Sequence, residues 1–260
     1  MLPYAAWPWL ALVFGLLIGS FSNVCIHRVP LRQSVVTPRS RCPRCLTMIA
    51  GWDNIPVLSY VFLGGRCRVC RGPISMRYPV VEALNGFLYY QLALQNPPGL
   101  PAAVRMVFVT ALLILSLIDL DHQILPDVIT LPGIAAGLAA SLLPGAPTPL
   151  TAALSAAAGY LAFMLVARAW QMLRGIEALG QGDWKLAAML GAFLGWQKLL
   201  LVVFLASFAG TLVGLAVILA RRGGFQHRLP LGTFLGAAGI AVLFIGDPLV
   251  DWYRRLLMVA

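Results

Sequence analysis

The chain consists largely of long apolar segments that recur along its whole length. The eight segments cover residues 7–26, 80–95, 103–120, 128–144, 150–168, 185–197, 199–220 and 231–249. About 20 apolar residues in a helix span the core of a bilayer, where backbone groups find hydrogen-bond partners only within helices or closed barrels. Of the 260 residues, 60% are apolar and 11% are charged, which excludes a water-soluble globule. The sequence therefore predicts an all-α, multi-pass membrane helix bundle with eight transmembrane helices.

One of these segments fits the pattern less well than the others. Residues 185–197 are bounded by Lys185 and Lys198 and are short for a full crossing. We therefore expect this segment to be tilted, half-buried or partly re-entrant.

Residues 28–78 differ in composition from the rest of the chain. They contain nine of the nineteen lysines and arginines and four of the five cysteines, with no long apolar run. We expect a small folded insert on one side of the membrane. The chain then divides into a first transmembrane helix (1–27), the insert (28–78) and a transmembrane bundle (79–260).

The distribution of positive charge predicts the orientation. With the N-terminus outside, alternating crossings place fifteen lysines and arginines, among them Arg221, Arg222 and Arg228, on the cytoplasmic side and four outside. Cytoplasmic loops carry such an excess, so we expect the insert in the cytoplasm. In a soluble protein the net charge of +10 would suggest nucleic acid. Here the lipid bilayer explains it, and no nucleic-acid partner is expected.

The insert contains two Cys-x-x-Cys pairs separated by 21 residues. Four thiolates at this spacing suit a closed, tetrahedral Zn²⁺ site that stabilises a small domain. A redox pair and unligated thiols are the alternatives, although a reducing cytoplasm disfavours disulfides. The predicted ligands are Cys42, Cys45, Cys67 and Cys70. The fifth cysteine, Cys25, is expected to be a small buried residue of the first helix.

Acidic residues in or beside apolar segments are costly to bury and point to function. Four acids have this placement: Glu82, Asp119, Asp121 and Asp183. Asp119 and Asp121 are about 200° apart around one helix, so only one of them can face a given partner. Asp183 follows Gly180 and Gly182 in Gly-Gln-Gly-Asp, where glycine permits close backbone approach and unusual dihedral angles.

The remaining acids carry less information. Asp127 follows Pro126 at the beginning of an apolar segment, and we expect it to cap that helix. Asp247 lies at the end of the last segment and is expected to be structural. Asp53 and Glu177 lie in polar loops and give no signal of their own.

The predicted topology brings acids from two helices, Asp119 and Asp183, to one membrane face. Two carboxylates that share a proton can activate water for attack on a peptide carbonyl. Such a pair can also relay protons in a transporter. The residues alone leave both interpretations open, whereas a dinucleotide site is excluded because no strand precedes the glycines.

Taken together, the motifs resemble the prepilin peptidases, the G-x-G-D membrane aspartic proteases that act as leader peptidases and N-methyltransferases of type IV pili and type II secretion. The matching stretches are residues 19–30, 40–45, 52–60, 65–70, 73–75, 78–82, 118–127 and 180–183. The resemblance implies catalysis by Asp119 and Asp183, with a supporting role for Asp121, Gly180 and Gly182. It also implies a zinc-binding insert.

The resemblance further implies a function and a location. A member of this family in the bacterial inner membrane would cut the cationic leader from a prepilin or pseudopilin at the cytoplasmic face. It would then methylate the new amine with S-adenosylmethionine, for which Glu82 is a weak candidate site residue between insert and bundle. A peptidase without methyltransferase activity, a proton-coupled transporter and a non-catalytic scaffold are the alternatives, and the oligomeric state is left open.

Overall fold

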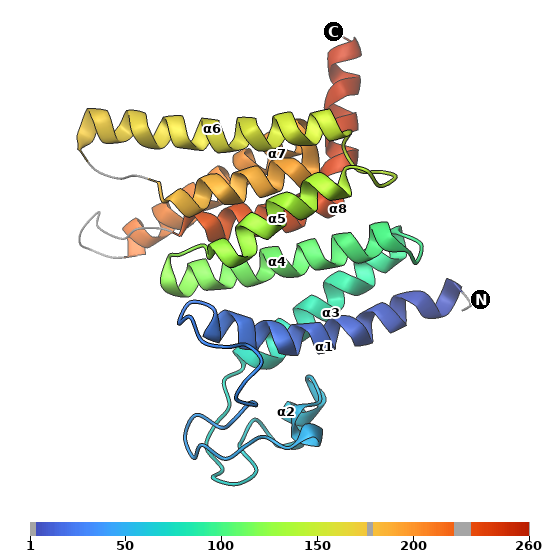
Figure 1. Cartoon of the computed structure of the whole chain (residues 1–260), viewed down its shortest axis with the longest axis vertical. Helices are drawn as coiled ribbons and strands as arrows, with labels where there is room; N and C mark the ends of the chain where they lie inside the picture. The colour runs from blue at the N-terminus through green and yellow to red at the C-terminus, as the bar shows by residue number, and fades with distance from the viewer. Residues whose placement is uncertain (1–3, 176–178, 221–229, 260) are drawn as a thin grey trace. The chain divides into compact units, whose positions relative to one another are not determined.

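The computed structural model describes residues 4–175, 179–220 and 230–259, which form helices joined by loops (Figure 1). The helices are η1 (Tyr4–Ala6), α1 (Trp7–Arg28), η2 (Gly51–Asn54), α2 (Leu58–Phe62), α3 (Arg77–Gln95), α4 (Leu100–His122), α5 (Asp127–Ala140), α6 (Pro149–Arg174), α7 (Gln181–Ala220) and α8 (Leu231–Val259). These ranges contain two isolated β-bridges and no strand, which confirms the all-α prediction.

The helices are those of a multi-pass membrane protein. Five are long and apolar enough to cross a bilayer, namely α1, α4, α6, α7 and the Leu231–Leu256 part of α8. The 14 residues of α5 cover only about 21 Å. Large apolar side chains such as Leu165 and Phe204 are exposed on α6 and α7, as suits a surface in contact with lipid.

The chain divides into two compact units, Met1–Thr110 and Ala111–Ala260, and the boundary falls within α4. The insert and its neighbouring helices belong to the first unit, and the helices that carry the candidate catalytic acids belong to the second. The division at residues 27 and 78 stays a prediction.

In the first unit, α1 and α3 pack closely because small residues lie at their contact. A Cβ atom on Gly19 would lie 2.7 Å from the Cα of Glu82, so this approach requires glycine. At the next level of the same contact, the Asn85 side chain of α3 donates a 2.8 Å hydrogen bond to the Gly15 carbonyl of α1. Asn85 Oδ1 in turn accepts a 2.9 Å bond from the Thr110 hydroxyl, so the buried amide is satisfied on both sides.

In the second unit, α7 consists of two antiparallel arms. Gly195 has φ 76° and ψ 169°, which lies outside the helical range and in a region that glycine adopts without strain. Two atoms from opposite sides of Gly195 approach the same glycine of α6. A Cβ on Gly159 would lie 2.8 Å from Ala187 O and 3.0 Å from Leu199 Cδ2. A straight helix would separate these two residues by about 18 Å. The chain therefore reverses at Gly195, and the sixth and seventh apolar segments are separate arms (Figure 1).

The last helix is longer than the apolar pattern predicts. It continues to Val259 with Pro248 inside it, whereas the predicted segment ends at residue 249. Proline removes one helical hydrogen bond, but neighbouring helices allow a membrane helix to continue past it. Asp247 forms a 2.7 Å ion pair with Lys198 on the second arm of α7, and its structural role stays a prediction.

The expectation that Asp127 caps α5 is wrong. The capping position is Pro126, and no side chain caps this helix. Asp127 is instead the first residue of α5 and forms a 2.6 Å ion pair with Lys185. The pair joins the beginning of α5 to the first turn of α7, two residues after Asp183.

Candidate active site and metal centre

Asp119 lies near the end of α4 and is 5% exposed, although its side chain is acidic. Its Oδ2 atom accepts a 2.7 Å hydrogen bond from the Thr233 backbone N–H and a 3.1 Å bond from the Thr233 hydroxyl. Thr233 is in the first turn of α8, where backbone N–H groups have no partner within the helix. Asp119 therefore occupies a position where donors and the helix dipole stabilise its negative charge.

The Thr233 hydroxyl has a second partner besides Asp119. It lies 3.0 Å from the Ser116 carbonyl, one turn before Asp119 on α4. A hydroxyl has one proton to donate, and its oxygen also accepts. It can therefore donate to an ionised Asp119, or donate to Ser116 and accept the proton of a neutral Asp119. This arrangement suits a carboxyl group that changes its protonation state.

Asp183 lies in the first turn of α7 and is 9% exposed. Its Oδ2 accepts a 3.1 Å hydrogen bond from the Gly180 backbone N–H. A Cβ on Gly182 would lie 2.7 Å from the Leu125 Cβ, so a side chain there would displace Leu125. Neither Gly180 nor Gly182 has a left-handed φ, so this motif uses glycine for close approach and not for unusual dihedral angles.

The structure brings Asp119 and Asp183 to one place. The Leu125 side chain lies against two glycines, one next to each acid. Gly182 is the residue before Asp183, and a Cβ on Gly232 would lie 2.9 Å from Asp119 Oδ2. The two carboxylates are also close enough for the charge of Asp119 to act on Asp183. Asp121, two positions further along α4, is exposed, in agreement with the 200° separation predicted for the two acids.

Glu82, the predicted candidate for a methyl-donor site, belongs to the first unit. It is 8% exposed on α3. Its Oε2 accepts a 2.7 Å hydrogen bond from the Val57 backbone N–H of the insert, and its carboxylate also bonds with the Ser20 side chain of α1. Glu82 thus holds the insert against the helix pair of this unit.

The four paired cysteines lie together in the insert. Their sulfur atoms are within 4.8 Å of one another, with Cys42–Cys70 at 3.8 Å and Cys45–Cys67 at 4.0 Å. Sulfurs around tetrahedral zinc are about 3.8 Å apart, since each Zn–S bond is about 2.3 Å. A disulfide would require about 2.05 Å. The donor set therefore fits a metal ion.

The two Cys-x-x-Cys pairs have the same backbone geometry. We call each pair with its following turn a knuckle (residues 41–48 and 66–73). In each knuckle the backbone N–H of the first cysteine donates a hydrogen bond to the carbonyl five residues later, that of Thr47 or Gly72. The residue after each second cysteine, Leu46 or Arg71, has φ 58°. An antiparallel bridge closes each knuckle, Arg41 with Met48 and Arg66 with Pro73. The insert thus contains an internal repeat offset by 25 residues, which the sequence analysis did not detect.

Two of the cysteine thiols have strongly shifted pKa values. Hydrogen bonds from the Thr47 side chain and backbone lower the pKa of Cys45 to about 6. The pKa of Cys70 is raised to about 11, because burial and the neighbouring thiols outweigh the lowering effect of the Gly72 backbone N–H. A positive charge beside Cys70 would favour its thiolate form.

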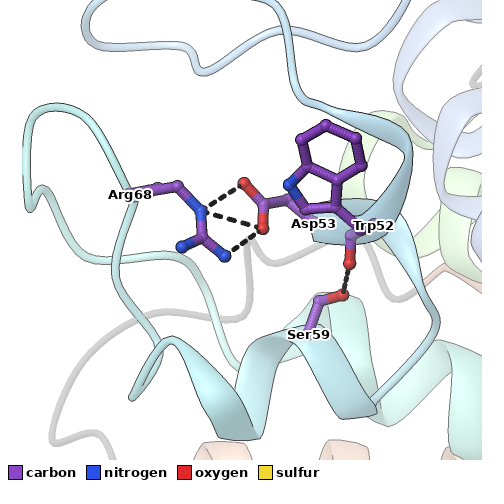
Figure 2. A network of polar contacts seen from close by, with 4 residues as sticks. All are labelled: Trp52, Asp53, Ser59 and Arg68. Atoms are coloured by element: carbon purple, nitrogen blue, oxygen red, sulfur yellow. Dashed lines mark hydrogen bonds and ion pairs between the residues drawn. The ribbon is translucent and has the colours of Figure 1, made fainter.

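An ion pair connects the second knuckle to the short helix η2 (Figure 2). Arg68, inside the Cys67–Cys70 pair, bonds with both carboxylate oxygens of Asp53 at 2.6 to 3.1 Å. The hydrogen bond from Arg68 lowers the pKa of Asp53. Beside it, the Ser59 hydroxyl donates a 2.8 Å bond to the Trp52 carbonyl. Asp53, which gave no sequence signal, therefore links η2 to the second cysteine pair.

Comparison with protein families gives two adjacent matches. Residues 13–96 match the bacterial peptidase A24 N-terminal domain, and residues 106–215 match the type IV leader peptidase family. A prepilin leader peptidase/N-methyltransferase from Burkholderia pseudomallei is 41% identical over 92% of this chain and 85% of its own length. The chain belongs to the type IV leader peptidase family.

Other relatives of this leader peptidase family have the same name. The protein from Aeromonas hydrophila is 38% identical over 95% of this chain and 94% of its own length. The protein from Myxococcus xanthus is 47% identical over 80% of this chain and 62% of its own length. No solved structure matches the chain significantly.

Thr233 is the residue near the acids that the sequence analysis missed, and it lies beyond the part that matches the leader peptidase family. None of the motifs that carry the family resemblance lies beyond residue 183. The signal that could have found Thr233 is the Leu-Pro-Leu-Gly-Thr sequence at 229–233, where Pro230 precedes a helix whose first N–H groups need acceptors.

Proposed function

We propose that this protein is a membrane-embedded aspartic endopeptidase that removes the short cationic leader of type IV prepilins or pseudopilins and N-methylates the new N-terminal residue. Membership of the leader peptidase family and the names of the relatives support both reactions. The observation that carries the proposal is the meeting of Asp119 and Asp183 around Leu125. These two acids are the proposed catalytic pair.

The two acids would hydrolyse the peptide bond by activating a water molecule themselves. One carboxylate takes a proton from water as the water oxygen bonds to the peptide carbonyl carbon. The other carboxyl group starts protonated and gives its proton to the carbonyl oxygen. As the C–N bond breaks, the leaving amine takes the proton held by the first carboxyl group, and a hydroxyl of the intermediate returns a proton to the second. Gly180 and Gly182 support this chemistry by holding Asp183 beside Leu125, and Asp121 has at most an indirect role.

Thr233 has a positioning role in this proposal. Its backbone N–H and hydroxyl both reach the same oxygen of Asp119, which leaves the other carboxylate oxygen for water or substrate. Since its hydroxyl can donate or accept, it can hold Asp119 in either protonation state. Thr233 is therefore expected to affect the rate without itself touching the peptide.

The proposed location is the bacterial inner membrane, with the N-terminus outside and the insert and the acids on the cytoplasmic side. The excess of positive charge in the cytoplasmic segments supports this orientation. Arg221, Arg222 and Arg228, which contribute to that excess, lie outside the described residues. The prepilin's hydrophobic helix would remain in lipid while its cationic leader is cut off at the interface.

The proposed metal is zinc, held by Cys42, Cys45, Cys67 and Cys70. Four thiolates leave no open coordination position, so the ion would stabilise the insert and take no part in hydrolysis. The proposed methyl donor is S-adenosylmethionine, whose sulfonium supplies a methyl group to the new amine. The bilayer and the prepilin are the proposed partners, in type IV pilus or type II secretion assembly, and nucleic acid is not among them.

The proposal is tested by incubating the purified chain in detergent with a prepilin and S-adenosylmethionine. The mass of the mature N-terminal peptide should show cleavage directly before the hydrophobic segment and a gain of one methyl group. An uncleaved prepilin, with the purified protein still folded by circular dichroism, would refute the peptidase. Cleavage without a mass gain would leave a leader peptidase that does not methylate.

A further inference from the structure

A cleft in the first unit lies between the end of α1 and the insert. Its volume is about 340 Å³, within the range of roughly 300–1,000 Å³ that holds drug-sized ligands. One wall is formed by the last turns of α1, including Ser20, Phe21 and Arg28. The other walls come from the loops at 35–40 and 49–56. The cleft is separate from the cysteine cluster and from the catalytic acids, neither of which lines it.

A strained backbone turn lies at one end of this cleft. Val57, directly after the lining residue Pro56, has φ 60° and ψ −49°, and the Leu58 N–H bonds to the Pro56 carbonyl at 2.6 Å. This is a γ-turn of the rarer hand, and it is a pronounced outlier for a β-branched residue. The Glu82 carboxylate holds the turn through the Val57 N–H. Such strain persists where the surroundings impose it and is concentrated at ligand sites.

The cleft is electrically asymmetric. Arg39 is exposed at its rim, and Arg28 donates hydrogen bonds of 2.9 and 2.8 Å to the Ser34 and Pro38 carbonyls that shape the loop wall. None of the described lining residues is acidic. The buried Glu82 carboxylate does not line the cleft but bonds with the lining residue Ser20 of α1. A ligand that carries both a carboxylate and a cationic centre matches this arrangement.

We infer that this cleft binds S-adenosylmethionine, an inference that rests on the methylation proposed above. The carboxylate of its methionine part would pair with Arg39, its purine would lie on the apolar wall near Phe21, and its sulfonium would point toward Ser20 and Glu82. On transfer the amine nitrogen bonds to the methyl carbon as the C–S bond breaks, and the amine loses one proton to water.

The test measures donor binding, methylation and cleavage on the same full-length chain in detergent. Ser40→Trp fills the cleft and Arg39→Glu reverses the charge at its rim. The matched controls are Gln33→Trp and Arg32→Glu, at exposed positions of the same segment that do not line the cleft. Equilibrium dialysis with tritiated S-adenosylmethionine gives the dissociation constant, and peptide mass spectrometry gives the other two activities.

We expect Ser40→Trp and Arg39→Glu to weaken donor binding at least tenfold and to lower methylation in parallel, with the cleavage rate within twofold of wild type. Wild-type donor binding in both variants would overturn the inference. A loss of cleavage equal to the loss of methylation would also overturn it, because the cleft would then serve the peptide. If the wild-type chain does not methylate, the proposed methylation itself is refuted. That outcome is read from the wild type and is therefore distinct from the outcome of the two cleft variants.

Discussion

The Thr233 hydroxyl offers the sharpest test of how the second unit holds its catalytic acid. Thr233→Val keeps the shape of the side chain and the backbone N–H bond to Asp119, but removes the 3.1 Å hydroxyl bond. A hydrogen bond to a charged group contributes about 1.5–3 kcal/mol. Because the hydroxyl is shared with the Ser116 carbonyl, we take the lower end of this range. A loss of about 1.5 kcal/mol of transition-state stabilisation corresponds to about tenfold in kcat/KM.

The assay is the initial rate of prepilin cleavage at several substrate concentrations, so that kcat and KM are separated. The Thr233→Val variant should lower kcat about tenfold with little change in KM, since the residue acts on Asp119 and not on the peptide. Thr233→Ser restores the hydroxyl and should recover most of the rate. Wild-type kcat in the valine variant, or no recovery in the serine variant when both are folded, would refute the positioning role.

Three further perturbations follow from the same structure. Gly182→Ala places a Cβ 2.7 Å from the Leu125 Cβ, so the turn that carries Asp183 must shift, and this misplacement should lower the cleavage rate roughly tenfold or more. Gly180→Ala meets only Asp183 Oδ2 at 3.5 Å and should be much milder, so equal rates would contradict the close-approach explanation. Cys67→Ser should reduce the zinc content measured by mass spectrometry from one ion per chain to almost none, and retention of zinc would exclude the four-cysteine site. Since Arg68 lowers the pKa of Asp53, the ionised carboxylate stabilises the insert at neutral pH, and this stability is lost as the pH falls through that lowered pKa. Asp53→Asn should therefore reduce the decline of the insert's melting temperature in acid, and an unchanged decline would show that another group is responsible.

Much of the fold is predictable from hydropathy and charge. Lipid-facing helices need continuous apolar residues, so each of the eight segments is visible in the sequence, and the break marked by Lys198 falls within three residues of the reversal at Gly195. The cysteine pairs are equally visible, because a metal site needs specific ligand types at short spacing. Acids in apolar segments are also conspicuous, because an ionisable side chain is costly to place there.

Contacts between distant segments are what the sequence does not predict. Thr233 bonds with Asp119 across 114 positions, and a threonine in an apolar segment looks like any other packing residue. Asp127 was expected to act locally as a cap, but its partner Lys185 is 58 positions away. The strained turn at Val57 depends on Glu82, from another helix. In each case the tertiary partner, which local propensity does not include, decides the role.

The central claim is that Asp119 and Asp183 together hydrolyse the prepilin. It is tested most directly by measuring cleavage in detergent with Asp119→Asn, Asp183→Asn and the matched control Asp251→Asn, whose carboxylate makes only a 3.6 Å surface ion pair with Arg254. Asparagine keeps the size of the side chain but can neither take nor give the proton. We predict cleavage at least a thousandfold slower in each of the first two variants and a wild-type rate in the control. Wild-type cleavage by either Asp119→Asn or Asp183→Asn would contradict the two-acid mechanism.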